Sequence, residues 1–307
     1  MTDNQTDGKC APLAENDHSL KRDGHGPGFC EQFALRAKES GEPGQSGART
    51  REQTPASGMV WFIGAGPGDP ELITVKGRRI ISEAGLVLYA GSLVPREVVA
   101  CADSRARVLD SSAMTLEEIH ALMREAALAG ETVARVHTGD PLLYGAAREQ
   151  MALLEADGVP CAVVPGVSAA FAAAAAGRVS LTVPEEVQSF AVTRLDGRTP
   201  VPRGQSVAEY ASHGGSLAVY LSAKTPDMLV RELRKGGVSE DTPVLLAHKV
   251  SWPEQKLAWA TLATLENIAR EQGFTRQTVF LILPGEKEGL RAASRLYDKS
   301  FCHGYRK

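Results

Sequence analysis

The chain has 307 residues, of which 43% are hydrophobic and 23% charged, a composition typical of a globular protein with room for two domains. Its formal net charge of -3 argues against a broad basic surface for nucleic acid, so any anionic ligand must be bound by local groups. No apolar run approaches the roughly 20 residues that a membrane-spanning helix requires. The five cysteines are scattered, odd in number and without a C-x-x-C pair, which favours reduced thiols and a cytoplasmic location.

Residues 1–58 differ in kind from the rest of the chain. They are rich in glycine, serine and charged residues and contain few large apolar ones, which predicts a mostly disordered extension. The spacings of its cysteines and histidines match no compact metal-binding finger, so no metal site is predicted there; these residues are Cys10, His18, His25 and Cys30. No apolar segment of the secretory type follows Met1.

From Met59 onward the pattern alternates between short apolar strands and amphipathic helices, which is typical of a parallel α/β sheet. Thr115 and Glu118 are spaced as a capping box at the start of one helix. The strands are expected within 60–66, 86–94, 106–112, 132–145 and 160–166, and the helices within 70–85, 115–131, 146–158 and 168–177. This first α/β domain is predicted to span residues 59–184, with its loops at the carboxyl ends of the strands, where open sheets usually bind ligands.

A second α/β domain is predicted over residues 185–307. Its strands are expected within 189–194, 216–222, 242–250, 256–262 and 278–285, and its helices within 225–237 and 264–273. Between the first two strands, residues 195–206 are rich in turn formers and arginine. This segment is either a substrate loop or a plain surface connection, and composition alone leaves both interpretations open.

The glycine-rich loop GAGPGDP, residues 64–70, resembles a nucleotide-binding loop but departs from it at two positions. Gly64 and Gly66 fit the dinucleotide fingerprint, whereas its sixth position is Asp69, whose carboxylate would repel a pyrophosphate. Pro67 also lacks a backbone donor. No Lys-Ser or Lys-Thr pair follows, which excludes a Walker loop. The loop is therefore suited to a close backbone approach to a ligand other than phosphate.

Four motifs in order resemble the tetrapyrrole methyltransferases, a family that uses S-adenosylmethionine (SAM). They are GAGPGDP (64–70), HTGDPLLYG (137–145), VVPGVSA (163–169) and QSFAVTR (188–194). The resemblance covers residues 59–307. It implies two αβα domains, with SAM in the cleft between them, and a homodimer. SAM carries a sulfonium and a carboxylate but no phosphate, in keeping with the opening loop.

Further motifs resemble the precorrin-4 C(11)-methyltransferase branch of this family, which acts in cobalamin biosynthesis. They are YAGSLV (89–94), YLSAKTP (220–226), AHKVSWPEQK (247–256) and SRLYDKSFCHGYRK (294–307). The uroporphyrinogen methyltransferases have an acidic residue and an arginine where this chain has Ala90 and Gly91. Precorrin-4 and cobalt-precorrin-4 both stay open as substrates, and a uroporphyrinogen-III or precorrin-3 methyltransferase is the alternative.

The resemblance also implies which residues contact SAM. Four of these residues also have a simpler structural interpretation: Ser168 caps a helix, Asp140 starts a turn, and Leu221 and Val250 pack in a core. The implied SAM contacts are Pro67, Thr138, Gly139, Asp140, Leu143, Ser168, Ala169, Leu221 and Val250.

The expected reaction is an in-line attack of a ring carbon of the tetrapyrrole on the SAM methyl, driven mainly by alignment. No catalytic base is predicted. The substrate carries several carboxylates, so Arg194 is the first candidate to bind it, followed by Arg198, Arg203 and Lys249. Asp69 is a further substrate-binding candidate because its loop faces the expected cleft.

Two other classes of protein remain as alternatives from the sequence alone. A nicotinamide oxidoreductase would use the opening loop as a dinucleotide fingerprint, which Asp69 disfavours. An RNA methyltransferase or an RNA-binding relative would need a basic stripe that the chain lacks. His137 and His248, at strand ends, are interpreted as structural rather than catalytic.

Overall fold

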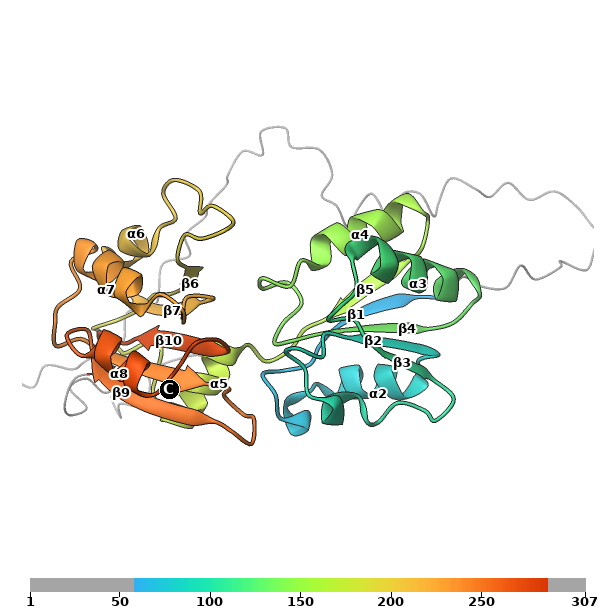
Figure 1. The fold of residues 1–307 in the computed structure, drawn as a ribbon, viewed down its shortest axis with the longest axis horizontal. Coiled ribbons are helices and arrows are strands. Elements are labelled where there is room, and N and C mark those ends of the chain that lie inside the picture. Colours follow the sequence, from blue (N-terminus) through green and yellow to red (C-terminus); the bar gives the residue numbers. More distant parts are fainter. Residues whose placement is uncertain (1–57, 287–307) are drawn as a thin grey trace, which may run out of the picture. The chain divides into compact units, whose positions relative to one another are not determined.

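The computed structural model describes residues 58–286 (Figure 1). The predicted extension and the terminal motif at 294–307 lie outside the described residues. The first sheet has the order β3-β2-β4-β1-β5, and all its neighbouring strands are parallel. All five strands predicted for this domain are confirmed; they are β1 (Val60–Gly64), β2 (Leu86–Tyr89), β3 (Arg107–Asp110), β4 (Val133–His137) and β5 (Cys161–Val164).

Helices cover both faces of this sheet (Figure 1). Helix α2 (Val75–Glu83) packs on one face through Ile80 and Ile81. Helices α3 (Leu116–Leu128) and α4 (Ala147–Ala156) pack on the other. The capping box at the start of α3 is confirmed, since both of its reciprocal hydrogen bonds form.

The predicted helix over 70–85 is wrong in its first turns. The segment instead forms the 3-10 turn η1 (Pro70–Leu72), an interruption, and then α2. The break occurs because Thr74 takes an extended conformation, and its hydroxyl accepts a hydrogen bond of 3.0 Å from Gly77 N. Thr74 is therefore the N-cap of α2.

The second sheet has the order β6-β7-β10-β8-β9 and is mixed: β6 and β7 are parallel, and the other pairs are antiparallel. Its five predicted strands are confirmed as β6 (Phe190–Arg194), β7 (Ser216–Tyr220), β8 (Pro243–His248), β9 (Lys256–Thr261) and β10 (Thr278–Ile282). The helices on one face are α6 (Val207–Ala211), which the sequence did not predict, α7 (Pro226–Lys235) and α8 (Leu265–Glu271). No helix within residues 58–286 has the length and apolar character to cross a membrane.

Helix α5 (Ala169–Gly177) covers the opposite face of the second sheet (Figure 1). Its alanines pack against Ala218, Leu245 and Leu281, and an added Cβ at Gly177 would lie 2.4 Å from a Leu245 methyl carbon. The predicted domain boundary at 184 and 185 places this helix with the first sheet. Its packing favours an earlier boundary, close to Gly166.

The strand directions bring the predicted ligand segments to two sheet edges. In the first sheet, the carboxyl ends of β1, β4 and β5 lie at one edge because these strands are parallel and adjacent. In the second sheet, β8 runs in the same direction as β7 because both are antiparallel to β10. The segments that follow β6, β7 and β8 therefore also share one edge.

Three glycines allow the loops of the first sheet to meet. An added Cβ at Gly64 would lie 2.5 Å from Gly166 N and 2.6 Å from Gly139 O. An added Cβ at Gly166 would lie 2.1 Å from Gly139 O. Side chains at Gly64 and Gly166 would therefore separate the loops after β1, β4 and β5.

We predict that Gly166→Ala lowers the free energy of unfolding by roughly 1–3 kcal/mol, the usual range for overpacking. Gly197→Ala is the matched control, because an added Cβ there has no atom of the described chain within 4 Å. Urea denaturation of both variants measures the difference. Equal stabilities would contradict the close packing of the three loops.

Candidate functional site

The loops after β1 and β4 are joined by a two-way backbone contact. Gly139 N donates to Gly66 O at 2.8 Å, and Gly66 N donates to Gly139 O at 3.3 Å. Gly139 has a φ of +59°, and an added Cβ would find Ser168 Cα and Val167 O at 4.0 Å. The turn thus presents bare backbone toward the start of α5, with room beside it for another group.

The Asp140 carboxylate organises this turn. Its Oδ1 accepts a hydrogen bond from Leu142 N at 2.9 Å, and its Oδ2 accepts one from Gly166 N at 3.0 Å. Asp140 therefore starts a turn and also ties the loop after β4 to the loop after β5. Through these two hydrogen bonds Asp140 fixes the backbone of the turn, which includes the neighbouring residues Thr138 and Gly139.

Ser168 and Tyr220 connect the start of α5 to the end of β7. Their hydroxyl oxygens are 2.6 Å apart, and Tyr220 Oη accepts a hydrogen bond of 2.7 Å from Ala170 N. Ser168 Oγ also accepts from Ala170 N, at the longer distance of 3.4 Å. The predicted capping role of Ser168 is confirmed, and the tyrosine takes the shorter of the two capping bonds.

Leu221 follows Tyr220 and has an unusual conformation for a large apolar residue. It is 74% exposed and has a φ of +56°. Core packing, the simpler interpretation, does not apply to Leu221, whereas Val250 is only 5% exposed and packs in the core with α5. Leu221 thus combines an exposed apolar side chain with a strained backbone, a combination that is more frequent at functional sites than elsewhere.

The loop after β1 contacts the turn that follows β8. Trp252 Nε1 donates to Pro67 O at 2.8 Å, and Asp69 N donates to Ser251 Oγ at 2.9 Å. The Asp69 carboxylate accepts a hydrogen bond from Glu71 N at 2.8 Å and caps η1. A dinucleotide pyrophosphate would need that same helix start, which further disfavours the oxidoreductase alternative.

The structure thus brings six of the nine predicted SAM contacts into one connected group. Hydrogen bonds link the loop of Pro67 to the turn of Val250, Gly139 to Gly66 in the loop of Pro67, and Ser168 to the tyrosine before Leu221. Asp140 joins the group through Gly166. The remaining three, Thr138, Leu143 and Ala169, are half-buried neighbours in sequence of these residues.

Arg194 organises the segment 195–206. Its guanidinium donates to the carbonyl oxygens of Leu195, Thr199 and Pro200 at distances of 2.9–3.2 Å. Burial raises the pKa of Tyr144, and the nearby positive charge of Arg194 partly opposes that increase. The ring of Tyr144 in turn lies 5.9 Å from that of Tyr220, so Arg194 belongs to the same edge as the predicted site.

Arg135 is a buried cation that the sequence did not single out. It is 5% exposed, and its guanidinium donates to Gln150 Oε1 and Ser111 Oγ, each at 2.9 Å, and to Leu88 O at 3.4 Å. None of the ion pairs found within residues 58–286 includes it. Burial lowers its pKa to about 10, so it stays charged at neutral pH. The network ties β4, which leads into the Gly-Asp-Pro turn, to α4, to β2 and to the residue that follows β3.

Both histidines at the strand ends are held in structural positions. His137 is buried against Phe62, and burial together with the Arg135 charge lowers its pKa to about 3. His248 stacks on Phe274, and its Nδ1 is 3.0 Å from Thr278 Oγ1. Burial lowers the pKa of His248 as well. A neutral His137 cannot donate a proton in the physiological pH range.

The loop after β2 is shaped by an acidic residue from β3. Asp110 Oδ1 accepts hydrogen bonds from Gly91 N at 2.9 Å and from Ser112 N at 2.8 Å, and these bonds lower its pKa. An added Cβ at Gly91 would lie 2.3 Å from Asp110 Oδ2. The absence of a side chain at Gly91 thus leaves room for the Asp110 carboxylate beside the loop.

Left-handed backbone concentrates at these edges. Of the eight residues other than glycine with positive φ in the described part of the chain, one is the predicted contact Leu221 and four lie within three residues of another predicted contact: Tyr144, Ala146, Lys249 and Ser251. Such conformations cost of order 1–3 kcal/mol each and cluster at binding sites. The strain supports a functional role for this region.

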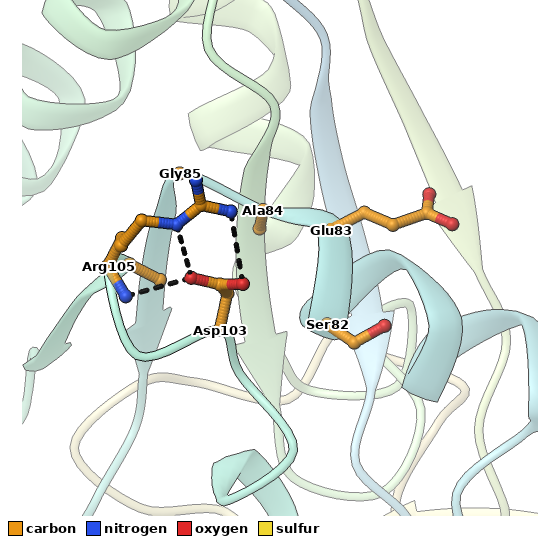
Figure 2. Close-up of a pocket in the computed structure, with 7 residues that line it drawn as sticks. Ser82, Glu83, Ala84, Gly85, Asp103 and Arg105 are labelled. Atoms are coloured by element: carbon orange, nitrogen blue, oxygen red, sulfur yellow. Dashed lines mark hydrogen bonds and ion pairs between the residues drawn. The ribbon is translucent and has the colours of Figure 1, made fainter.

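A surface depression lies at the other end of the first sheet (Figure 2). It is lined by the end of α2, the residues before β2, and Asp103 with Arg105. These two form an exposed ion pair of 2.9 Å, which lowers the pKa of Asp103 to about 2. The depression lies at the amino ends of β2 and β3, whereas the predicted contacts of this domain follow the carboxyl ends of its strands, so the two are separate. No cluster of three metal-ligating side chains occurs between residues 58 and 286.

Comparison with known proteins agrees with this geometry. Residues 59–266 match the family model of the Tetrapyrrole (Corrin/Porphyrin) Methylases, and the chain belongs to that family. It is 43% identical over 251 residues to the cobalt-precorrin-4 C(11)-methyltransferase of Priestia megaterium, covering 81% of this chain and 97% of that relative. It is 42% identical over 250 residues to the precorrin-4 C(11)-methyltransferase of Pseudomonas aeruginosa, covering 80% and 98%.

Two solved structures share the fold. The X-ray structure of a cobalamin biosynthetic enzyme, cobalt precorrin-4 methyltransferase, aligns with a TM-score of 0.71 and 42% identity over 73% of this chain and 94% of that one. A uroporphyrin-III C-methyltransferase from Thermus thermophilus, complexed with S-adenosylhomocysteine, aligns with a TM-score of 0.61 and 28% identity over 76% and 97%. The predicted family and fold are thereby confirmed.

Proposed function

We propose that the protein transfers a methyl group from SAM to carbon 11 of precorrin-4 or cobalt-precorrin-4, a step of cobalamin biosynthesis. One observation carries the proposal: the chain is 42–43% identical to two relatives of that activity over 97–98% of their lengths. One relative is named for the cobalt form of the substrate and the other is not. Both substrates therefore remain within the proposal.

The residues at the two sheet edges fit SAM. The Gly-Asp-Pro turn offers backbone groups and the open side of Gly139, which suit the ribose and amino-acid portions. The exposed Leu221 offers apolar surface for the adenine, whereas the proposed contact Pro67 is itself buried. Thr138, Asp140, Leu143, Ser168, Ala169 and Val250 complete the proposed SAM contacts.

SAM, when bound, supplies a methyl group on a sulfonium that is already a good leaving group. The protein then has to align the methyl with the ring carbon and exclude water. Asp140, Tyr220 and the glycine contacts fix the loops that would do so. Arg194 and Tyr144 would bind substrate carboxylates, and Asp69 would contact the substrate from the opposite loop.

Analysis of products by mass spectrometry tests the proposed activity. The protein and SAM are incubated separately with precorrin-4, cobalt-precorrin-4 and uroporphyrinogen III. We expect one added methyl with one or both forms of precorrin-4 and none with uroporphyrinogen. Methylation of uroporphyrinogen alone would favour the alternative member of the family.

We also propose a homodimer in the cytoplasm. The thiols of Cys101 and Cys161 are free, which suits a reducing compartment. The dimer rests on family resemblance. Sedimentation at micromolar concentration should show twice the chain mass of 32.7 kDa, and a monomer alone would contradict it.

Gly139→Val should weaken SAM binding severely, because the new side chain would project beside the turn, toward Ser168 and Val167. Its positive φ adds strain, so thermal unfolding must be measured alongside binding. Asp69→Asn should behave differently, since an asparagine also caps η1. We expect it to reduce methyl transfer more than SAM affinity.

Calorimetric titration with SAM, paired with turnover of the tetrapyrrole, separates the two effects. Asp69→Asn reports on the loop after β1, and Gly139→Val reports on the loop after β4. Loss of SAM binding in Asp69→Asn, or unchanged binding in Gly139→Val, would show that SAM contacts other residues.

A further inference from the structure

In the turn after β8, Ser251 and Trp252 contact the loop after β1, although neither residue was predicted to have a role. Within it, Trp252 N donates to Lys249 O at 3.0 Å and Ser251 N donates to Gln255 Oε1 at 2.7 Å. Lys249 N donates to Gln277 O at 2.7 Å, which fixes the start of the turn. Lys249 and Ser251, on either side of Val250, have φ values of +44° and +67°. Val250 thus lies in a strained turn fixed by hydrogen bonds on both sides of it, which we call the 249–255 turn.

The indole of Trp252 fixes the one remaining freedom of Pro67. The proline ring already locks φ, and the residue has no N–H, so only ψ and the carbonyl are free to move. Trp252 Nε1 donates to that carbonyl oxygen at 2.8 Å. The direction of the Pro67 peptide is therefore set by a side chain 185 residues away in the sequence.

The same indole restricts the next residue. An added Cβ at Gly68 would lie 2.3 Å from Trp252 Cδ1 and 2.5 Å from its Nε1. Glycine would otherwise be the most mobile residue of the loop. The following amide, that of Asp69, donates to Ser251 Oγ at 2.9 Å. Residues 67–69 are thus each held by the 249–255 turn.

The turn therefore carries one proposed SAM contact, Val250, and holds another, Pro67. The two contacts come from different sheets, and their separation decides whether both can touch one ligand. We infer that Trp252 is a positioning residue for SAM: it sets the distance between Pro67 and Val250 and so determines SAM affinity. This inference rests on the proposed SAM site and adds to it a residue that need not touch the ligand.

The test compares Trp252→Phe with Trp259→Phe in the full chain. Phenylalanine keeps much of the packing of Trp252 but removes the N–H donor. Trp259 on β9 is 48% exposed and is the matched control. Calorimetry should give a SAM dissociation constant raised roughly three- to tenfold in Trp252→Phe, the range for one lost hydrogen bond, and unchanged in Trp259→Phe.

Two further measurements separate positioning from general stability. Ser251→Ala removes only the bond to Asp69 N, so it should weaken SAM binding in the same direction and speed hydrogen exchange at the Asp69 amide. SAM should change the tryptophan emission of Trp259→Phe, which retains Trp252, and change that of Trp252→Phe much less. Melting temperatures of the variants should stay close to that of the wild type.

Equal SAM affinity in Trp252→Phe and Trp259→Phe would overturn the inference. So would weakened binding that simply tracks a lowered melting temperature across all three variants. Failure of the proposed function looks different: the wild type would bind SAM with the predicted dependence on Trp252 but leave precorrin-4 unmethylated. A wild type that binds no SAM would overturn both.

Discussion

The close backbone contact of Gly64, Gly139 and Gly166 is the constraint on which the site depends. Three parallel strands end at neighbouring places on one edge, but side chains would normally keep their loops apart. Without side chains at these positions the loops meet, and Asp140 can reach the amide of Gly166. The glycine-rich loop thus serves loop packing, while only Gly139 keeps its open side free.

The electrostatics of this edge follow from how its polar groups are satisfied. Asp140 accepts hydrogen bonds from amides, Arg194 donates to carbonyls, and Arg135 donates to a side-chain amide, a hydroxyl and a carbonyl. Burial, helped by the nearby Arg135 charge, lowers the pKa of His137 and keeps it neutral. Such a site suits the proposed methyl transfer, which depends mainly on alignment because the sulfonium of SAM is already a good leaving group.

The sequence predicted all ten strands and most helices because alternating and helical periodicity report burial directly. It could not place α5, since a helix that is alanine on nearly every side has no apolar face to indicate its partner. The family motifs supplied the residues of the candidate site. Arg135 and Trp252 escaped because their roles depend on partners 15 to 47 and 185 residues away, which no local pattern encodes.

The departures of the opening loop from a phosphate-binding loop now have a physical explanation. Asp69 occupies the start of η1 with its own carboxylate, and Pro67 gives its carbonyl to Trp252, so the loop presents neither a free helix start nor a row of free amides. A phosphate would have to compete with the Asp69 carboxylate for this helix start. The same contacts fix the proline ring in place. The residues that make the loop unsuitable for a phosphate are thus the same ones that fix the backbone at Pro67, a proposed SAM contact.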